Sequence, residues 1–172
     1  EVAHQVLCER AIQVGGKLDA YVNNAGRSAW RPISKIDDAF FDELMAINLK
    51  GAFWGCKAAA AAMAETGGAI INISSMAAKR GSANNAMYCA TKFGMNGLTQ
   101  SLCKELGPKQ IRVNALCPVL IETDGLIEAL SEPDAPGGED AQAFLKNFKM
   151  ANSALGRLPT GADVGNMTVF LA

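Results

Sequence analysis

The sequence has little net charge and no long hydrophobic run. Lys plus Arg number 16 and Asp plus Glu number 17, which gives a formal net charge of -1. A chain with this balance lacks the positive surface that binds nucleic acid and the cationic face that binds anionic lipid. Its longest apolar run, Ala58 to Ala64, is far shorter than the ~20 residues that cross a bilayer. We therefore expect neither a nucleic-acid partner nor a membrane partner.

Metal-binding and disulfide patterns are also missing. The cysteines are odd in number, scattered, and form no C-x-x-C pair: Cys8, Cys56, Cys89, Cys103 and Cys117. His4 is the one histidine, so the chain cannot supply the ligands of a zinc site. We interpret the cysteines as small, mostly buried side chains in a protein of the reducing cytoplasm.

What the sequence does contain is the composition of one folded domain. It has 172 residues, of which 49% are hydrophobic and 19% charged. A chain of this length can bury a real core, and we treat 1–172 as one domain. It begins inside an expected helix without Met and stops at Phe170–Ala172 without a closing turn. We expect the fold to be incomplete at both ends.

Apolar periodicity and turn residues predict an alternation of helices and short strands. Helices are expected over 1–14, 37–65 and 85–106 and after Thr160, and buried strands over 18–22, 69–74 and 111–116. Gly51 and Gly55, four apart in the second helix, suggest a close approach of another backbone or a break. This order predicts βαβ units, and so an α/β fold with a doubly wound parallel sheet and helices on both faces.

Polar and small residues follow each expected strand, at the edge where parallel sheets bind ligands. They are Asn23 to Gly26, then Ser74 and Ser75, then Pro118 to Thr123. Turn formation alone also favours these residue types. Tyr88 and Lys92 are four apart and share one helix face, and Tyr88 comes 13 residues after Ser75. A tyrosine packed on a lysine stem at the surface is the alternative interpretation.

Together these motifs resemble the classical short-chain dehydrogenase/reductase family. The resemblance rests on Asn23-Asn24-Ala25-Gly26, Asn48, Ser75, Tyr88-Cys89-Ala90-Thr91-Lys92, and the strand ending at Cys117-Pro118 with Thr123. It covers residues 1 to about 123, and Leu155-Gly156-Arg157 continues it. It implies a Rossmann-like fold, NAD or NADP as cofactor, a small alcohol or ketone as substrate, and a homotetramer or homodimer.

The resemblance also implies a role for each motif residue. Tyr88 is the acid/base, Lys92 holds the ribose and lowers the tyrosine pKa, Ser75 binds the reacting oxygen, and Asn48 anchors a relay water. The implied cofactor contacts are Asn23, Ala25, Gly26, Tyr88, Lys92, Pro118, Val119, Ile121 and Thr123. An ammonium about 4 to 5 Å from a phenol supplies roughly 3 to 4 kcal/mol, close to what moves its pKa from about 10 to about 7.

Two departures from the family pattern leave other functions open. No glycine-rich phosphate turn precedes Asn23, and Val119 stands where the family usually has glycine. The acidic or basic residue that selects between NAD and NADP is expected upstream of this sequence. The alternatives are a 3-oxoacyl thioester reductase, a catalytically incompetent binding or assembly module, and a Schiff-base enzyme that uses Lys92.

The segment 124–150 is expected to cover the substrate. Its apolar residues would contact the substrate, namely Leu126, Ile127, Leu130, Phe144, Leu145 and Phe148. Its acidic residues are interpreted as a solvated outer face, namely Glu128, Glu132, Asp134, Glu139 and Asp140. Extra apolar residues on two helices suggest subunit packing, with core packing as the alternative: Phe53, Trp54, Met63, Met95, Leu98 and Leu102.

Overall fold

The computed structural model describes residues 1–172, and helices alternate with strands along the chain. The α-helices are α1 (Val2–Gly15), α2 (Asp38–Leu44), α3 (Gly51–Ala62), α4 (Ala86–Leu106), α5 (Asp124–Leu130), α6 (Ala141–Asn152) and α7 (Gly161–Leu171). The strands are β1 (Ala20–Asn23), β2 (Gly68–Ile73) and β3 (Ile111–Leu116). Short 3₁₀ turns lie at η1 (Ile33–Lys35), η3 (Met76–Ala78) and η4 (Gly107–Lys109), and η2 (Met45–Lys50) is a π-turn.

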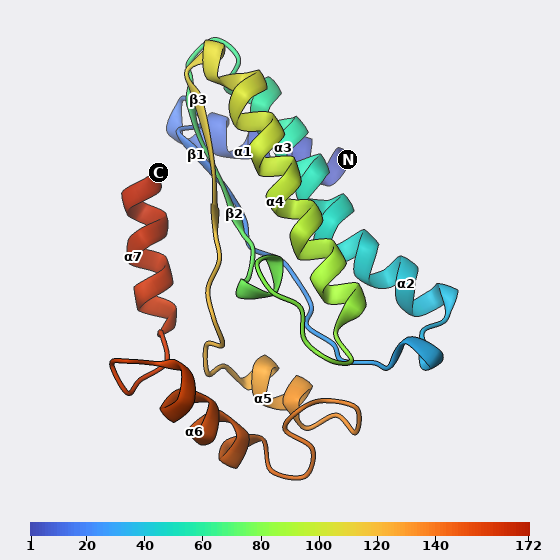
Figure 1. Cartoon of the computed structure of the whole chain (residues 1–172). Coiled ribbons are helices and arrows are strands. Elements are labelled where there is room, and N and C mark those ends of the chain that lie inside the picture. Colours follow the sequence, from blue (N-terminus) through green and yellow to red (C-terminus); the bar gives the residue numbers. More distant parts are fainter.

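The three strands form one parallel sheet in the order β1-β2-β3. Ala20 is paired with Ala69, and Gly68 with Ile111, so the three strands begin at nearly the same level of the sheet. Figure 1 shows α3 and α4 on one face of this sheet and α7 on the other. The predicted α/β fold with a parallel, Rossmann-like sheet and helices on both faces is confirmed.

The main core lies between the sheet and the layer of α1, α3 and α4. It holds Cys8, Leu18, Tyr21, Cys56, Ala58, Ala59, Met63, Ile70, Leu106, Ile111 and Val113. Met63 and Met95 are almost completely buried, so the prediction that they belong to a subunit surface is wrong. The alanine-rich turns of α3 let that helix lie close to the sheet, because Ala58 and Ala59 add little bulk.

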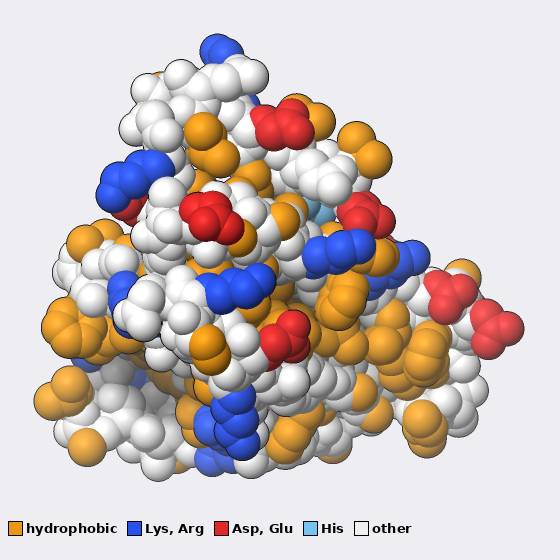
Figure 2. All heavy atoms as spheres, turned by 90° about the horizontal axis from the view of Figure 1, so that it is seen from above, with side chains coloured by type: hydrophobic (Ala, Val, Ile, Leu, Met, Phe, Trp, Pro, Cys, Tyr) orange, Lys and Arg blue, Asp and Glu red, His pale blue; other side chains and the backbone are white.

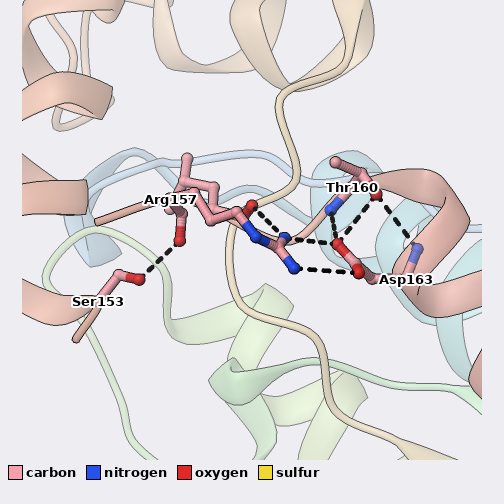
Figure 3. A network of polar contacts seen from close by, with 5 residues as sticks. Ser153, Arg157, Thr160 and Asp163 are labelled. Atoms are coloured by element: carbon pink, nitrogen blue, oxygen red, sulfur yellow. Dashed lines mark hydrogen bonds and ion pairs between the residues drawn. The ribbon is translucent and has the colours of Figure 1, made fainter. Parts of the chain in front are cut away.

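Helix α7 is fixed at both of its ends. Thr160 and Asp163 form a reciprocal capping box at its start, and Arg157 forms an ion pair with Asp163 2.7 Å away (Figure 3). The Asp163 amide in the first turn donates to Thr160 Oγ1 at 3.2 Å, and the Thr160 amide donates to Asp163 Oδ2 at 2.8 Å. The box therefore satisfies one free N–H group of the helix and the amide of its N-cap residue. At the other end, the Arg112 guanidinium of β3 donates to the carbonyl oxygens of Leu171 and Ala172, at 2.6 and 2.8 Å.

The predicted helix over 37–65 is continuous but not regular. Asp37 caps it, as expected, by accepting a hydrogen bond from the Phe40 amide. The π-turn η2 joins α2 to α3, and the chain does not break at Gly51 or Gly55. A Cβ on Gly55 would lie 2.1 Å from Asn23 Oδ1, so this glycine admits a side chain of β1 rather than another backbone.

The predicted cover segment lies beyond the carboxyl ends of the strands as α5 and α6 (Figure 1). It has a small core of its own, composed of Trp30, Leu130, Ala135, Ala141, Leu145 and Leu158. Leu130 and Leu145 therefore stabilise the cover, which differs from the expectation that they contact substrate. Asp134 pairs with Lys35, and Asp140 caps α6.

All five cysteines are free thiols. Among the helices, none combines the length and the apolar character that crossing a bilayer requires.

Candidate active site

Backbone hydrogen bonds hold together the loops that follow β2 and β3. The Ser74 amide donates to Leu116 O at 2.7 Å, and the Met76 amide donates to Pro118 O at 2.8 Å. Ser74 Oγ also lies 3.4 Å from Lys92 O, which brings α4 to the same edge of the sheet. Three segments that are far apart in the sequence therefore meet where parallel sheets bind ligands.

A cavity of about 530 Å³ opens at this junction. Tyr88 and Ser75 contribute hydroxyl groups to its wall. Its apolar side is formed by the cover and the loop after β3, including Leu120, Leu126, Phe144 and Phe148. A mostly apolar cavity with a few polar groups is the usual form of a small-molecule site.

Tyr88 and Ser75 interact across this cavity. Burial of the phenol raises the pKa of Tyr88, while the hydrogen bond from Ser75 acts in the opposite direction. Ser75 Oγ also accepts a hydrogen bond from the Ala77 amide at 3.1 Å, which fixes the orientation of its side chain. The two hydroxyl groups can thus bind one oxygen atom of a ligand together.

Lys92 lies beside Tyr88, with its Nζ 5.7 Å from the centroid of the tyrosine ring. The side chain is buried, and Nζ donates to Ile73 O at 2.9 Å. Burial lowers the pKa of Lys92 to about 8, with the Cys117 thiol acting in the opposite direction. Lys92 is not among the groups that shift the pKa of Tyr88, and burial is the largest effect on it, so the lowering of the Tyr88 pKa by Lys92 stays a prediction.

Asn48 is completely buried inside the π-turn η2. Its Oδ1 accepts a hydrogen bond from the Arg27 amide at 2.8 Å, and its Nδ2 donates to Arg27 O at 2.9 Å. Nδ2 also lies 3.3 Å from Thr91 Oγ1 on α4. Asn48 therefore ties the loop after β1 to the helix that carries Tyr88 and Lys92.

A second cavity, of about 560 Å³, adjoins the first and shares Tyr88 with it. Lys92 and Gly26 line it. A Cβ on Gly26 would lie 3.3 Å from Asn48 Oδ1 and 3.5 Å from Lys92 Nζ, so glycine keeps the backbone close to the ammonium. An ammonium carries three donors, and Lys92 makes one hydrogen bond within the protein. The remaining donors fit a ligand rich in hydroxyl oxygens, such as the ribose of a nicotinamide cofactor.

The implied cofactor residues divide between these two cavities. Gly26, Tyr88, Lys92 and Thr123 line the second cavity, and Pro118, Val119, Ile121 and again Tyr88 line the first. Asn23 lies elsewhere: it is buried beneath the loop and donates to Asn72 Oδ1 at 2.8 Å. Ala25 is exposed and lines neither cavity. Glu128 and Glu132, expected on an outer face, are exposed and border the second cavity.

Several wall residues of the first cavity have no signal in the sequence. Trp30 lines both cavities although it lies in a stretch interpreted only as a loop. Asn85, which directly precedes α4, has the sequence pattern of an ordinary helix cap. Arg80 and Ser82 belong to the loop between β2 and α4. Only the folded arrangement shows that these residues share one cavity.

Comparison with known proteins decides the family. The family model described as short chain dehydrogenase matches residues 1–134. The chain belongs to the short-chain dehydrogenase family. Its overall fold agrees with a solved member, described as a short-chain alcohol dehydrogenase from Sinorhizobium meliloti. That structure has a TM-score of 0.85 and 32% identity, and the match covers 99% of this chain and 64% of the other.

Curated relatives in the family are named as dehydrogenases and reductases. The chain is 33% identical to 2-(S)-hydroxypropyl-CoM dehydrogenase 3 of Xanthobacter autotrophicus, a match covering 94% of this chain and 61% of the relative. It is 33% identical to a Staphylococcus aureus diacetyl reductase ((S)-acetoin forming), covering 91% and 61%. It is 37% identical to the 3alpha-hydroxysteroid dehydrogenase of Mediterraneibacter gnavus, covering 91% and 58%. The chain thus spans about three fifths of the length of these relatives.

Proposed function

We propose that this short-chain dehydrogenase interconverts a secondary alcohol and a ketone by hydride transfer with NAD or NADP. The observation that carries the proposal is the shared wall of the two cavities. The Tyr88 and Ser75 hydroxyls line the first cavity, and the Lys92 ammonium lines the second. The relatives, named for hydroxypropyl, diacetyl and hydroxysteroid substrates, support alcohol and ketone chemistry.

In this proposal each residue acts on one atom of the reaction. Ser75 donates a hydrogen bond to the reacting oxygen, and Tyr88 exchanges a proton with it. Lys92 holds the ribose hydroxyls beside Tyr88. Asn48, in η2, supports α4 and the loop after β1, and it anchors the water of the proton relay. The nicotinamide, when bound, supplies or accepts the hydride. Ser75 has no general base beside it and is not a nucleophile.

The pKa values in this structure favour Tyr88 as a proton donor in its resting form. Burial holds the phenol protonated, with its pKa raised above the ordinary 10.0. Donation to a developing alkoxide suits ketone reduction. In the oxidative direction the proton must leave Tyr88, and a positive charge close to the phenol stabilises the phenolate. The Lys92 ammonium and the cationic ring of an oxidised nicotinamide are the groups that supply that charge.

Isotope transfer tests the proposed reaction directly. The protein expressed from its complete reading frame is incubated with NAD or NADP and secondary alcohols that carry deuterium on the carbinol carbon. We expect the deuterium in the reduced cofactor and a ketone as product, both detected by mass spectrometry. A reduced cofactor without deuterium, or no reduced cofactor with any alcohol of the series, contradicts the proposal.

A Schiff-base reaction at Lys92 is the second candidate, because burial lowers the pKa of that amine to about 8 and makes it a better nucleophile. Borohydride would then trap a covalent adduct between Lys92 and a carbonyl substrate. We expect no adduct, since Nζ is already hydrogen-bonded to Ile73 O in a buried position.

We also propose that two copies of the chain associate through α2, η2, α3 and α4. Exposed hydrophobic side chains gather where α2 and α3 lie, on the right-hand side of Figure 2. Phe41, Ile47, Phe53 and Phe93 are between 39% and 49% exposed. A cavity lined by Met45, Leu49, Phe53 and Leu98 lies between these elements. Phe53→Glu should convert the assembly to monomers in sedimentation analysis, and a monomeric parent contradicts the proposal.

The free thiols support a location in the cytoplasm, where such groups stay reduced.

A further inference from the structure

Asn85 occupies the N-cap of α4 but does not cap the helix. Asparagine at this position ordinarily accepts a hydrogen bond from an amide in the first turn. Here the side chain makes no capping bond. Instead Asn85 Nδ2 donates to Ser82 Oγ at 3.2 Å. The residue is therefore held in an orientation that helix formation does not explain.

The oxygen of this side chain is the one buried side-chain polar atom without a partner in the structure. Asn85 is 5% exposed, and its Oδ1 has no hydrogen-bond donor. Leaving a buried acceptor unpaired is costly, because folding removes its water without replacing it. Asn85 also lines the first cavity, so its unpaired oxygen lies in the wall beside the space where a ligand would bind.

Asn85 also lies close to the reacting groups. It precedes Tyr88 by three residues, about one turn of the same helix, so both side chains belong to one wall of the cavity. The lining of the same cavity also includes the apolar side chains of Leu126, Phe144 and Phe148. A substrate that fills this space has an apolar body between the reacting oxygen and the polar group that Asn85 contacts.

We propose that Asn85 determines specificity by accepting a hydrogen bond from a second hydroxyl group of the substrate. The inference rests on the proposed function and narrows its substrate class to apolar alcohols and ketones that carry another hydroxyl. A site built around an acceptor rejects the analogue without that hydroxyl, because the acceptor then stays unpaired. A cavity wall made only of apolar groups discriminates much less between the two.

Matched substrates that differ by one hydroxyl test this role. The protein from the complete reading frame is assayed with cyclohexanol and with trans-cyclohexane-1,4-diol, and kcat/KM is compared for each. We expect the parent to prefer the diol, and Asn85→Leu to reduce the diol-to-alcohol ratio roughly ten- to a hundredfold. Asn85→Asp keeps acceptor oxygens and is expected to keep the preference. An Asp variant that loses the preference as fully as Asn85→Leu contradicts an acceptor role.

The neighbouring Asn84 provides a control in the same loop. It does not line the cavity, and its φ of 58° suits glycine. We expect Asn84→Gly to keep the parental ratio. Thermal unfolding separates specificity from a capping role. Loss of a genuine cap would lower the melting temperature of Asn85→Leu markedly. Here the substitution removes an unpaired buried oxygen together with one hydrogen bond to Ser82, so we expect a small change only.

The outcomes distinguish this inference from the proposed function. A parent that is active on the series but shows the same ratio as Asn85→Leu overturns the role of Asn85 alone. A parent that oxidises no alcohol of the series and reduces no corresponding ketone with either cofactor contradicts the proposed function as well.

Discussion

Lys92 is a charged group that the fold buries at a cost. The residue is 4% exposed, and its ammonium has one backbone acceptor, Ile73 O. Burial without a carboxylate partner disfavours the charged form, which explains the pKa of about 8. A lysine held in this way is suited to bind a ligand, because a hydroxyl-rich ligand provides the hydrogen bonds that the protein does not.

Replacing Lys92 therefore affects stability in a pH-dependent way. Below pH 8 the lysine is protonated in both folded and unfolded chains, so its burial penalty is fully present. The penalty disappears as the pH rises from about 8 to 10.5, where the unfolded chain also releases the proton. We expect Lys92→Met to raise the free energy of unfolding at pH 7 by about 1 to 3 kcal/mol, less toward pH 10.

Chemical denaturation across this pH range measures the effect. Lys104→Met, on the exposed side of α4, is the control and should show no such trend. A Lys92→Met protein less stable than the parent at pH 7 would show that the ammonium stabilises the fold. The same variant should also lose catalytic activity and cofactor affinity in the complete protein.

Ser75 is expected to act mainly in the transition state. Its hydrogen bond to the reacting oxygen strengthens as negative charge develops there. Ser75→Ala should therefore lower kcat roughly tenfold or more while KM changes little. Steady-state kinetics on the complete protein measures both constants. A large rise in KM at constant kcat would instead indicate a role in ground-state binding.

Among the elements, α3 depends on a glycine where it crosses β1. Gly55 leaves the space into which Asn23 Oδ1 and the Tyr21 ring fit, and Asn23 also donates to Asn72. This polar contact continues from Asn72 Nδ2 to Thr99 Oγ1 on α4 at 2.9 Å. The strands and both helices are thus joined through one buried chain of side chains.

Adding one methyl group at this crossing should disrupt it. We expect Gly55→Ala to destabilise the fold by about 1 to 3 kcal/mol, because the new Cβ overlaps Asn23. Gly165→Ala in α7 is a matched control: nothing lies within 4 Å of its Cβ, so alanine should stabilise the helix by up to about 1 kcal/mol. Equal effects of both substitutions in thermal or denaturant unfolding would contradict this account.

The elements were largely predictable from the sequence, whereas details of their geometry were not. Short apolar runs next to turn residues predicted the three strands, and Gly107-Pro108 marked the end of α4 correctly. The π-turn at Met45–Lys50 has no sequence signal, since its residues are ordinary helix formers. Asn23 looked like a ligand residue because it ends a strand, but the direction of its side chain depends on Gly55, 32 positions away.

The candidate site shows the same division. Tyr88, Lys92, Ser75 and Asn48 were proposed from the sequence because their types and spacing form a recognisable pattern. The sequence pattern could not show that the pKa of Tyr88 is raised, because the shift depends on how deeply the fold buries the phenol. Asn85 was missed for a related reason: whether an N-cap side chain caps or turns into a cavity is decided by tertiary structure.

At the scale of the whole molecule, two cavities are built from three loops and a helical cover. The sheet positions the residues proposed to react, α5 and α6 contribute apolar residues to the first cavity, and the family relationship supports hydride transfer as the proposed activity. The 172 residues contain no glycine-rich turn to bind a pyrophosphate.

The 172-residue chain by itself should therefore bind a dinucleotide weakly. Lys92 and Gly26 line the cavity proposed for the ribose side of a cofactor, but no glycine-rich turn in the sequence offers the backbone amides that would bind its phosphates. We expect a dissociation constant well above the micromolar range when this chain is titrated with NADH by fluorescence. Micromolar binding by the 172-residue chain would contradict the expectation.

The most direct measurement of the central claim is the rate of hydride transfer in the Tyr88→Phe protein expressed from the complete reading frame. The phenylalanine ring retains the packing of the tyrosine, so the fold and the melting temperature should be close to those of the parent. Loss of the proton donor should lower kcat by roughly 100- to 10,000-fold. A folded Tyr88→Phe protein with a nearly parental rate would show that the proton comes from another group and would contradict the assignment of Tyr88.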